Sequence, residues 1–485
     1  MDAYWKDAEQ SIRYTDTIES EAVSAVRIRD YLGESDDLVS STLAFGAVSA
    51  ACFCIDGLVK ESVVDENILS AFNEMDVFKA CKSEKQAVKL IESGYVNHAS
   101  VKKAASLQAA IEGILSANFV MVFDKCHCAF IFDVKGFQSR SLEEPESESV
   151  IKGSKDGFSE PIRINTAIVR RHIRSHDLVI KQIEIGTVAK TTVALIFMKN
   201  IADSALVQAV EQRLQGAQIS SLTSLGQLEK HISARQFALL PTVMHTERAD
   251  KLSANILNGK IAVLTDGYPV GFIVPANLAM FMQAPEDYSA APLYASFVRL
   301  IRYACLAVNL FLPALYIAVA NFSCEILPAK LAQSIMQAKF GMPFSTFTEV
   351  VLMLIAFEIL IESGLRLPNG VGQAVSIVSG LIVGDAAVSA KLASPAVVML
   401  TAIAGITSFV LPYQSLANSL RVIRFALVLA AAAGGIFALA LGVTLMIFYF
   451  NGVENFALPF LTPFSTGSAR SLLRDTIIRR QRGAD

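Results

Sequence analysis

The second half of the chain contains apolar segments long enough to cross a lipid bilayer, and these limit its possible folds. A membrane-spanning helix needs about 20 consecutive, mainly apolar residues. Residues 303–322 meet this length. Further apolar runs follow at residues 350–361, 371–388, 395–411 and 425–450. The sequence therefore predicts an α-helical, polytopic membrane domain.

The composition agrees with a membrane protein. Hydrophobic residues make up 53% of the chain, charged residues 18%, and the mean hydropathy is +0.45. A soluble protein with so low a fraction of charged residues normally has a lower fraction of hydrophobic residues. Residues 325–342 are less apolar and contain Lys330 and Lys339, which indicates a loop or an interfacial helix.

Arginines flank the apolar runs and predict their orientation, because Lys and Arg favour the cytoplasmic side. Arg299 and Arg302 precede the first run. Arg421 and Arg424 precede the last run, and a basic tail follows it. One span cannot keep both of its ends in the cytoplasm. We therefore expect one segment to be re-entrant, incomplete or differently paired.

Charged residues lie inside the apolar stretch 349–388. Each costs on the order of 2.5 kcal/mol or more at the centre of a membrane helix, so such groups usually face a bundle interior or a water-filled path. Glu358, Glu362 and Arg366 recur at i, i+4 and i+8, which forms one stripe where the last two can pair. Glu349 falls on the opposite face. These four residues are candidates for intramembrane ion pairing or gating.

A stripe of small and polar residues follows the charged one. Gln373, Ser376, Gly380 and Gly384 recur at i, i+3, i+7 and i+11, and Asp385 stands beside the end. Two interpretations remain open. Small residues let membrane helices pack closely, and the same stripe around a symmetry axis could line a pore, where a carboxylate would favour cations.

The first half of the chain alternates helical and strand patterns. Strand pairs are predicted within residues 41–59, 117–137 and 181–198, and residues 84–115 are expected to form helical segments. A helix, a strand, the Asp266–Gly267 turn and a second strand are predicted within residues 245–275. We predict an α/β cytosolic region of two subdomains. The expected boundaries are a helical arm at 1–36, the α/β region at 37–290, the membrane domain at 291–465 and a basic tail at 466–485.

The sequence favours neither an enzyme nor a nucleic-acid binder. It contains no phosphate-binding loop, no Ser-His-Asp arrangement and no paired catalytic carboxylates. Cys126, His127 and Cys128 lack a second ligand pair at zinc spacing, so a metal site is disfavoured. The net charge of −3 argues against nucleic acid. We expect no metal and no cofactor, and the seven cysteines suggest a reducing cytosolic side.

Residues 137–177 alternate acidic and basic clusters. Glu143 and Glu144 precede a helix, expected to begin near Asn165, that carries Arg170 and Arg171. Complementary charge of this kind can hold subunits in register. A solvated surface is the alternative.

Several motifs resemble the A subunit of the GerA family of spore germination receptors. They include FDVKGFQSRSLEEPESESVIKGSKDGF, NTAIVRRHIRS, HTERADK, PEDY, FEILIESGLRLPNGVGQAVSIVSGLIVGDAAV and SLRVIRF. They occur in the same order over about residues 123–464, roughly seventy per cent of the chain. Departures from the family pattern include Ala249 for a proline, Leu354 for a carboxylate and Ile361 for an arginine.

The resemblance implies a homo-oligomeric, pentameric cation channel in the spore inner membrane, with the large N-terminal region in the cytosol. Its partners would be membrane lipid, a nutrient-binding B subunit and a C lipoprotein. The implied cation path uses the stripe from Gln373 to Asp385. The implied subunit contacts are Arg140, Glu143, Glu144, Arg170, Arg171, Glu247 and Arg248. The alternative is a non-conducting accessory protein like the stage V sporulation AF protein.

Overall fold

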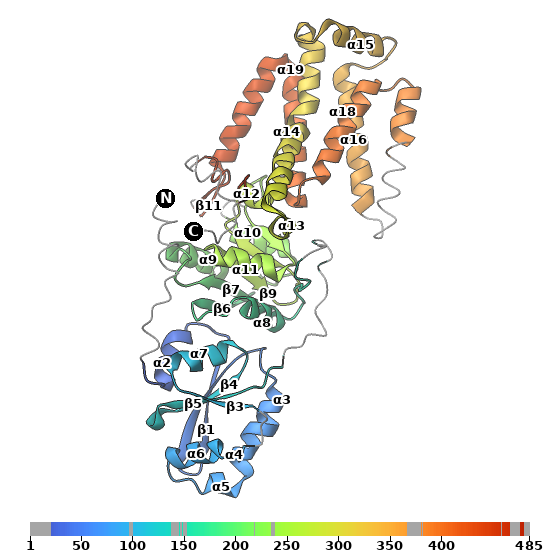
Figure 1. Ribbon diagram of the computed structural model, residues 1–485. Coiled ribbons are helices and arrows are strands. Elements are labelled where there is room, and N and C mark those ends of the chain that lie inside the picture. Colours follow the sequence, from blue (N-terminus) through green and yellow to red (C-terminus); the bar gives the residue numbers. More distant parts are fainter. Residues whose placement is uncertain are drawn as a thin grey trace. The chain divides into compact units, whose positions relative to one another are not determined.

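The chain divides into two compact units in a computed structural model. The structure describes residues 21–96, 100–136, 145, 148, 153–217, 219–233, 238–365, 380, 382–456, 458–465 and 476–479. Unit 1 comprises Met1–Gln236 and Val243–Pro275, and unit 2 comprises Phe237–Thr242 and Ala276–Asp485. Unit 1 holds two antiparallel sheets and unit 2 holds the long helices, as Figure 1 shows. The predicted fold class, an α/β region followed by a helical region with apolar helices, is confirmed.

The first sheet of unit 1 has five antiparallel strands in the order β1-β2-β4-β5-β3. Its strands are β1 (Leu38–Phe45), β2 (Val48–Ile55), β3 (Val101–Ala104), β4 (Phe119–Phe123) and β5 (Cys128–Phe132). Its helices are α2 (Ala25–Leu32), α3 (Glu61–Val63), α4 (Ser70–Glu74), α5 (Asp76–Lys79), α6 (Glu84–Glu92) and α7 (Leu107–Leu115). A separate apolar core covers each face, one including α4 to α6 and the other α2 and α7. These elements form the first module, residues 25–132.

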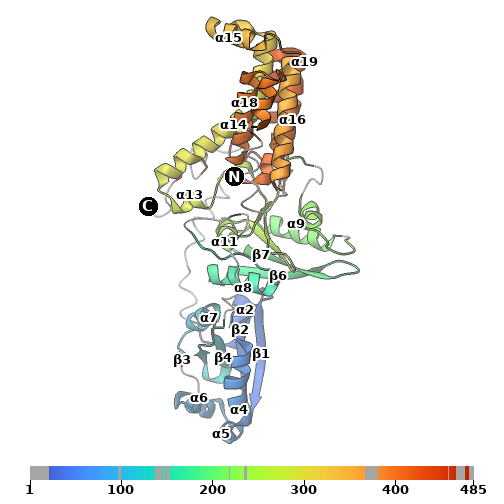
Figure 2. The same ribbon diagram turned by 90° about the vertical axis from the view of Figure 1, so that its right-hand side faces the viewer.

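The second sheet has the order β6-β7-β9-β10-β8. Its strands are β6 (Leu178–Ile185), β7 (Thr191–Met198), β8 (Met244–Thr246), β9 (Ile261–Thr265) and β10 (Gly271–Val274). Its helices are α8 (Ile162–His172), α9 (Ser204–Gln215), α10 (Leu225–Ile232) and α11 (Ala249–Leu257). These elements form the second module, residues 162–274 (Figure 2).

The two modules are structural repeats. Each begins with a helix and a hairpin, continues through helices to an edge strand and a further helix, and ends with a second hairpin. In both sheets the third strand lies at the edge beside the fifth. The same connectivity in two consecutive sheets indicates an internal duplication.

Matching hydrogen bonds confirm the repeat. Asp124 Oδ1 accepts from Ala25 N at 2.7 Å at the start of α2, and Asp266 Oδ1 accepts from Ile162 N at 3.0 Å at the start of α8. Asp37 O and Asp177 O each accept, at 2.8 Å, from the residue after the second strand, which is Asp56 or Lys199. The left-handed residues after α7 and α11, Ala117 and Gly259, also correspond.

The two modules are joined through a buried arginine. Arg170 on α8 is 1% exposed, and its Nε and Nη2 lie 2.9 Å from the two carboxylate oxygens of Asp37. Nη2 also donates to Ser35 Oγ, and Nη1 donates to Ser175 O and Leu178 O. All the donor atoms of this guanidinium therefore have acceptors within unit 1.

Unit 2 is a helical bundle. Short α12 (Leu278–Phe281) and α13 (Glu286–Ser289) lead into α14 (Pro292–Phe322). The other main helices are α15 (Ala329–Lys339), α16 (Thr346–Leu365), α18 (Pro395–Phe409) and α19 (Gln414–Gly452), followed by strands β11 (Glu454–Asn455) and β12 (Leu458–Pro459). Among the described residues, α14 and α19 are long and apolar enough to cross a membrane. Helix α14 contacts α16, α18 and α19.

Helix α19 is a hairpin rather than one straight rod. Its 39 residues would extend about 58 Å as a continuous helix. Gly434 and Gly435 interrupt it, and Gly435 has a φ of +61°, a conformation that glycine adopts most readily. A Cβ on Gly442 would lie 3.2 Å from Leu427 Cδ2, so the second arm lies against the first.

The two ends of α19 meet at one position. Leu239 O accepts from Ser419 Oγ at 2.6 Å, and Leu239 N donates to Tyr449 Oη at 2.8 Å. Residues near the start and the end of α19 thus share a single partner. The prediction of one long span over residues 425–450 is wrong, and the hairpin explains how both basic flanks can lie at the same end.

Two local predictions are also corrected. Residues 84–115 are not wholly helical, because β3 lies between α6 and α7. This edge strand of four residues carries Lys102 and Lys103, and it is too short to show a clear period in the sequence. Helix α8 begins at Ile162, before the expected Asn165, because the Asp266 carboxylate accepts from its first N–H.

Candidate functional site

The interior of unit 2 contains a carboxylate shared by two arginines. Glu358 on α16 accepts from Arg424 Nη2 at 2.5 Å through Oε1, and its Oε2 lies 3.3 Å from Arg421 Nη1. Arg421 and Arg424 are three residues apart on the first arm of α19, which directs both toward one neighbour. One negative charge therefore faces two positive charges.

This cluster is not fully hydrogen-bonded. Arg424 is 2% exposed, and its Nε and Nη1 are buried without an acceptor among the described residues. Arg421 Nε is in the same state. A buried donor without a partner costs roughly 1–3 kcal/mol, and more when the group is charged. Charged side chains inside an apolar helical bundle are candidates for a functional site.

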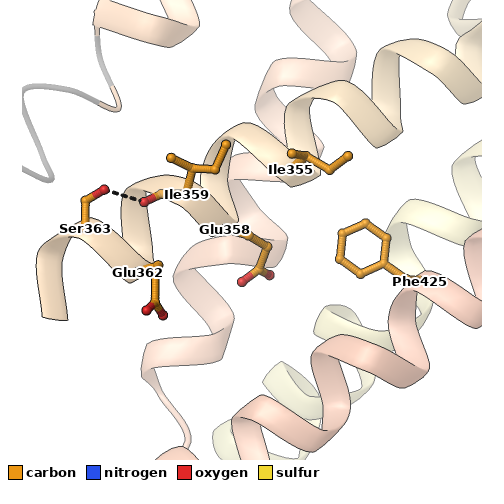
Figure 3. Close-up of a pocket in the computed structure, with 6 residues that line it drawn as sticks. All are labelled: Ile355, Glu358, Ile359, Glu362, Ser363 and Phe425. Carbon is orange, nitrogen blue, oxygen red and sulfur yellow. Dashed lines mark hydrogen bonds between the residues drawn. The ribbon is translucent and has the colours of Figure 1, made fainter. Parts of the chain in front are cut away.

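An open hollow of about 480 Å³ lies beside the cluster. It is lined by Ile355, Glu358, Ile359, Glu362, Ser363 and Phe425. Figure 3 shows the Glu358 and Glu362 carboxylates one turn apart on α16, with Phe425 of α19 opposite Ile355. The hollow thus has a carboxylate-bearing side, where both oxygens of Glu358 are paired with arginines, and an apolar side.

Glu349 lies elsewhere in the bundle, at the first turn of α16. It is 1% exposed, and its Oε2 accepts from Ser394 N at 3.0 Å, at the N-terminus of α18. Its Oε1 is buried without a hydrogen-bond partner in the part of the chain that the structure describes. A carboxylate at a helix N-terminus is stabilised by the helix dipole. Glu349 therefore links α16 to α18 and does not belong to the Glu358 cluster.

A third charged group lies where α14 begins. Asp287 Oδ2 accepts from Arg299 Nε at 3.1 Å and from Arg302 Nη1 at 2.6 Å, and all three residues are buried. Arg479 also reaches this region, where its Nη2 donates to Tyr288 O at 2.6 Å. The basic residues in the first turns of α14 and Arg479 near the C-terminus therefore lie together.

The predicted pore stripe is described only in part. Gln373 and Ser376 lie outside the described residues, as does Arg366 of the charged stripe. Gly380 has open space where a Cβ would be, and Asp385 is exposed. Gly384 is buried, with Val398 Cγ1 of α18 3.3 Å from the position of a Cβ.

The predicted subunit contacts have different surroundings. Arg140, Glu143 and Glu144 lie outside the described residues. Arg170 is buried in the joint between the modules. Arg248 is 1% exposed and donates to Asp250 Oδ2 at 2.6 Å and to Ser154 O at 2.9 Å. Arg171 pairs with Asp156, and Glu247 is half-buried. Arg170 and Arg248 thus use their charge within the chain.

The cysteines of unit 1 behave as core residues. Burial raises the pKa of Cys52 to about 12 and that of Cys54 to about 11, so both are thiols at neutral pH. Among the described residues, no group of three or more His, Cys, Asp and Glu side chains could hold a metal ion.

Sequence reasoning missed the partners of Glu358. It used Arg421 and Arg424 only as markers of orientation and paired Glu362 with Arg366. The available signal was the spacing of Arg421 and Arg424, which are three residues apart near the start of an apolar helix. Two arginines on one helix face can pair with a carboxylate stripe on another helix. Sequence spacing shows which residues share a face, but it does not show which helix that face meets.

The sequence matches the family described as "Bacillus/Clostridium GerA spore germination protein" over residues 26–483. It is 31% identical over 455 residues to spore germination protein B1 of Bacillus subtilis, covering 93% of each chain. Spore germination protein KA of the same organism is 31% identical over 451 residues, covering 92% of this chain and 82% of that protein.

A solved structure is also similar, the N-terminal domain of the A subunit of the Bacillus megaterium spore germinant receptor GerK3. It is 26% identical, covers 53% of this chain and 97% of its own, and superposes with a TM-score of 0.43.

Proposed function

The chain belongs to the GerA family of spore germination proteins, and from this membership we propose that it is the A subunit of a nutrient-gated germinant receptor that conducts cations. Several of its relatives of similar length are spore germination proteins, which supports a role in germination. The observation that carries the conducting role is the incompletely paired Glu358 cluster inside an apolar helical bundle.

The hairpin of α19 supports a multi-pass arrangement. Its first arm, residues 414–433, extends about 30 Å, and its second arm about 25 Å. The hydrocarbon core of a bilayer is about 30 Å thick. In this proposal each arm crosses, and the arginine-bearing start of α14, both ends of α19 and Arg479 face the cytosol. The predicted crossing at residues 371–388 remains part of the proposal.

In this account the cations pass along the stripe from Gln373 to Asp385, around the axis of a homo-oligomer that we propose to be a pentamer. Glu358 and Glu362 supply carboxylates beside that path. Arg421 and Arg424 hold Glu358 in the closed state, and their unpaired donors make that state easier to leave. A nutrient-binding B subunit and a C lipoprotein would control the opening in the spore inner membrane.

Potassium release from spores tests the proposal. Spores without this chain should release no potassium in response to the nutrient, and spores with the wild-type chain should release it within minutes. Asp385→Asn should slow the release about tenfold, because a pore carboxylate concentrates cations. Normal release without the chain would refute the proposal.

A non-conducting accessory role is the second candidate. The close approach of Gly384 to Val398 favours it, because small residues that only pack helices need no water beside them. Under this role, Gly380→Phe would leave potassium release unchanged while receptor assembly fell. Under the channel role, the same substitution would block release from an assembled receptor.

A further inference from the structure

The joint between the two modules is a contact between a turn and a sheet edge. The turn before β1, residues 34–37, lies along the edge strand β6. Asp36 N donates to Ile180 O at 2.8 Å, Ile180 N donates to Ser35 Oγ at 2.9 Å, and Gln182 N donates to Asp36 Oδ2 at 2.6 Å. The turn therefore satisfies backbone groups that an edge strand otherwise leaves open.

Because the modules are repeats, each half of this contact has an equivalent. The turn 34–37 corresponds to residues 174–177, where Ser175-His176-Asp177-Leu178-Val179 matches Ser35-Asp36-Asp37-Leu38-Val39 at four of five positions. The edge strand β6 corresponds to β1. Among the described residues, no second copy of this contact is made by the first edge. The second turn is half-buried in its own chain, where Ser175 O accepts from Arg170 Nη1 and the His176 ring lies 5.9 Å from that of Tyr31.

The exposure of the two edges differs where the turn docks. Leu178, Val179 and Ile180 on β6 are 0%, 3% and 0% exposed. On β1, Val39 is 44% exposed, and Ser40 is exposed as well. Strand β1 has no charged residue in its eight positions, whereas the edge strands β3 and β6 carry lysines and the remaining edge strand, β8, has only three residues. An uncharged, exposed edge strand is a template for pairing.

The backbone N–H and C=O groups of β1 that a docking turn would bond point away from β2. Its two-residue turn makes Phe45 and Val48 a hydrogen-bonded pair, so odd-numbered residues of β1 face β2. Ser40 and Thr42 therefore direct their backbone groups outward. They correspond to Ile180 and Gln182, the residues that bond the turn in the joint.

Charge complementarity is kept with its signs reversed. In the joint, Glu34 Oε1 lies 2.7 Å from Lys199 Nζ. The equivalent residues are Arg174 on the second turn and Asp56 after β2. Arg174 is exposed, and Asp56 is half-buried beside Arg163. A turn from another copy would therefore bring a cation to a carboxylate.

We propose that the turn 174–177 of one copy docks on strand β1 of a second copy, repeating the joint between chains. The inference rests on the proposed homo-oligomer and names one contact within it. Asp30 stands where the second module has Arg170, and Asp177 is the counterpart of Asp37, so the repeated contact has two carboxylates in place of the buried ion pair. The contact between copies is accordingly weaker than the joint, and it can be broken without unfolding the modules.

Cross-linking of the full-length chain tests the contact. Ser40→Cys combined with Ser175→Cys, treated with a short bis-maleimide, should give covalent dimers at five or more times the yield of either single variant. The wild-type chain measures the background from its own seven cysteines. Glu34→Cys combined with Lys199→Cys, an exposed pair whose charged atoms lie 2.7 Å apart in one chain, is the matched control, which should cross-link within one chain and give no additional dimer.

Backbone and charge variants sharpen the test. The N–H of Thr42 points away from β2, so Thr42→Pro removes a donor for the second copy and spares the hydrogen bonds between β1 and β2. This substitution should lower dimer yield at least fivefold, while Thr42→Val should not. Arg174→Glu should lower the yield and Arg174→Lys should keep it. An oligomer with no Ser40–Ser175 cross-link would overturn this inference and leave the proposed assembly intact. A monomeric chain in the membrane would refute the assembly itself.

Discussion

Two buried arginines show how differently the two units of this chain use charge. Arg170 in unit 1 has an acceptor for each of its three nitrogens, including both oxygens of Asp37. Arg424 in unit 2 donates to Glu358 through Nη2, but its Nε and Nη1 have no acceptor among the described residues. Both side chains are almost fully buried.

The difference separates a structural joint from a working site. A buried charge is tolerated when its hydrogen bonds are complete, and removing its partner then costs about 3–5 kcal/mol. An incompletely bonded buried charge lowers stability, so it usually has a functional reason. We therefore interpret the Arg170–Asp37 pair as the fixed connection between modules and the Glu358 cluster as a site that can change partners.

The largest expected effect is on the joint. Asp37→Asn leaves the Arg170 guanidinium buried without a full counter-charge, and we expect a loss of about 3–5 kcal/mol in the free energy of unfolding of unit 1. Pulse proteolysis of the full-length chain in urea would measure it. Asp36→Asn, which keeps an oxygen for Gln182 N at an exposed position, should cost less than about 1 kcal/mol. A loss below 1 kcal/mol for Asp37→Asn would contradict our interpretation of the Arg170–Asp37 pair as the fixed connection between the modules.

A smaller loss is expected in the helical bundle. Arg424→Gln gives up one charged hydrogen bond and also removes one unbalanced positive charge. The same assay, applied to unit 2, should show a loss of no more than about 1–3 kcal/mol. If Arg424→Gln destabilises unit 2 as much as Asp37→Asn destabilises unit 1, the cluster is a structural element and our interpretation of it is wrong.

The smallest effect concerns the core of unit 1 at alkaline pH. Burial raises the pKa of Cys52 to about 12, above the value of about 8.5 for an exposed thiol. Between these values the folded state keeps a proton that the unfolded state loses, so stability falls as pH rises above about 8.5, by about 1.4 kcal/mol per pH unit. Cys52→Ala should flatten this slope between pH 9 and 10 in urea unfolding. An unchanged slope would mean that Cys52 is not deprotonated on unfolding.

The fold class could be predicted because the hydrophobic patterns that identify helices and strands are visible within short stretches of sequence. Apolar runs identified the helical region, and the Asp266–Gly267 turn between apolar segments identified the last hairpin of unit 1. The hairpin of α19 was missed, since Gly434 and Gly435 lie within an uninterrupted apolar run that a single helix could also contain. Only the conflict between the two basic flanks indicated that a break existed.

The internal repeat and the Glu358 cluster depend on contacts between distant residues. The repeat leaves one short signal, the match between SDDLV at 35–39 and SHDLV at 175–179. Packing, capping and strand order keep the two modules alike while most side chains differ. For Glu358, periodicity gave the correct face of α16, but the partner on α19 is 63 and 66 residues away, and local spacing cannot identify it.

The central claim is that the incompletely paired Glu358 cluster serves ion passage, and potassium release tests it most directly. Spores carrying Glu358→Gln should release nutrient-triggered potassium at least tenfold more slowly or more quickly than wild type, with the chain present at the wild-type level. Glu325→Gln, at an exposed residue after α14, is the matched control and should behave as wild type. Wild-type release from Glu358→Gln spores would contradict the claim.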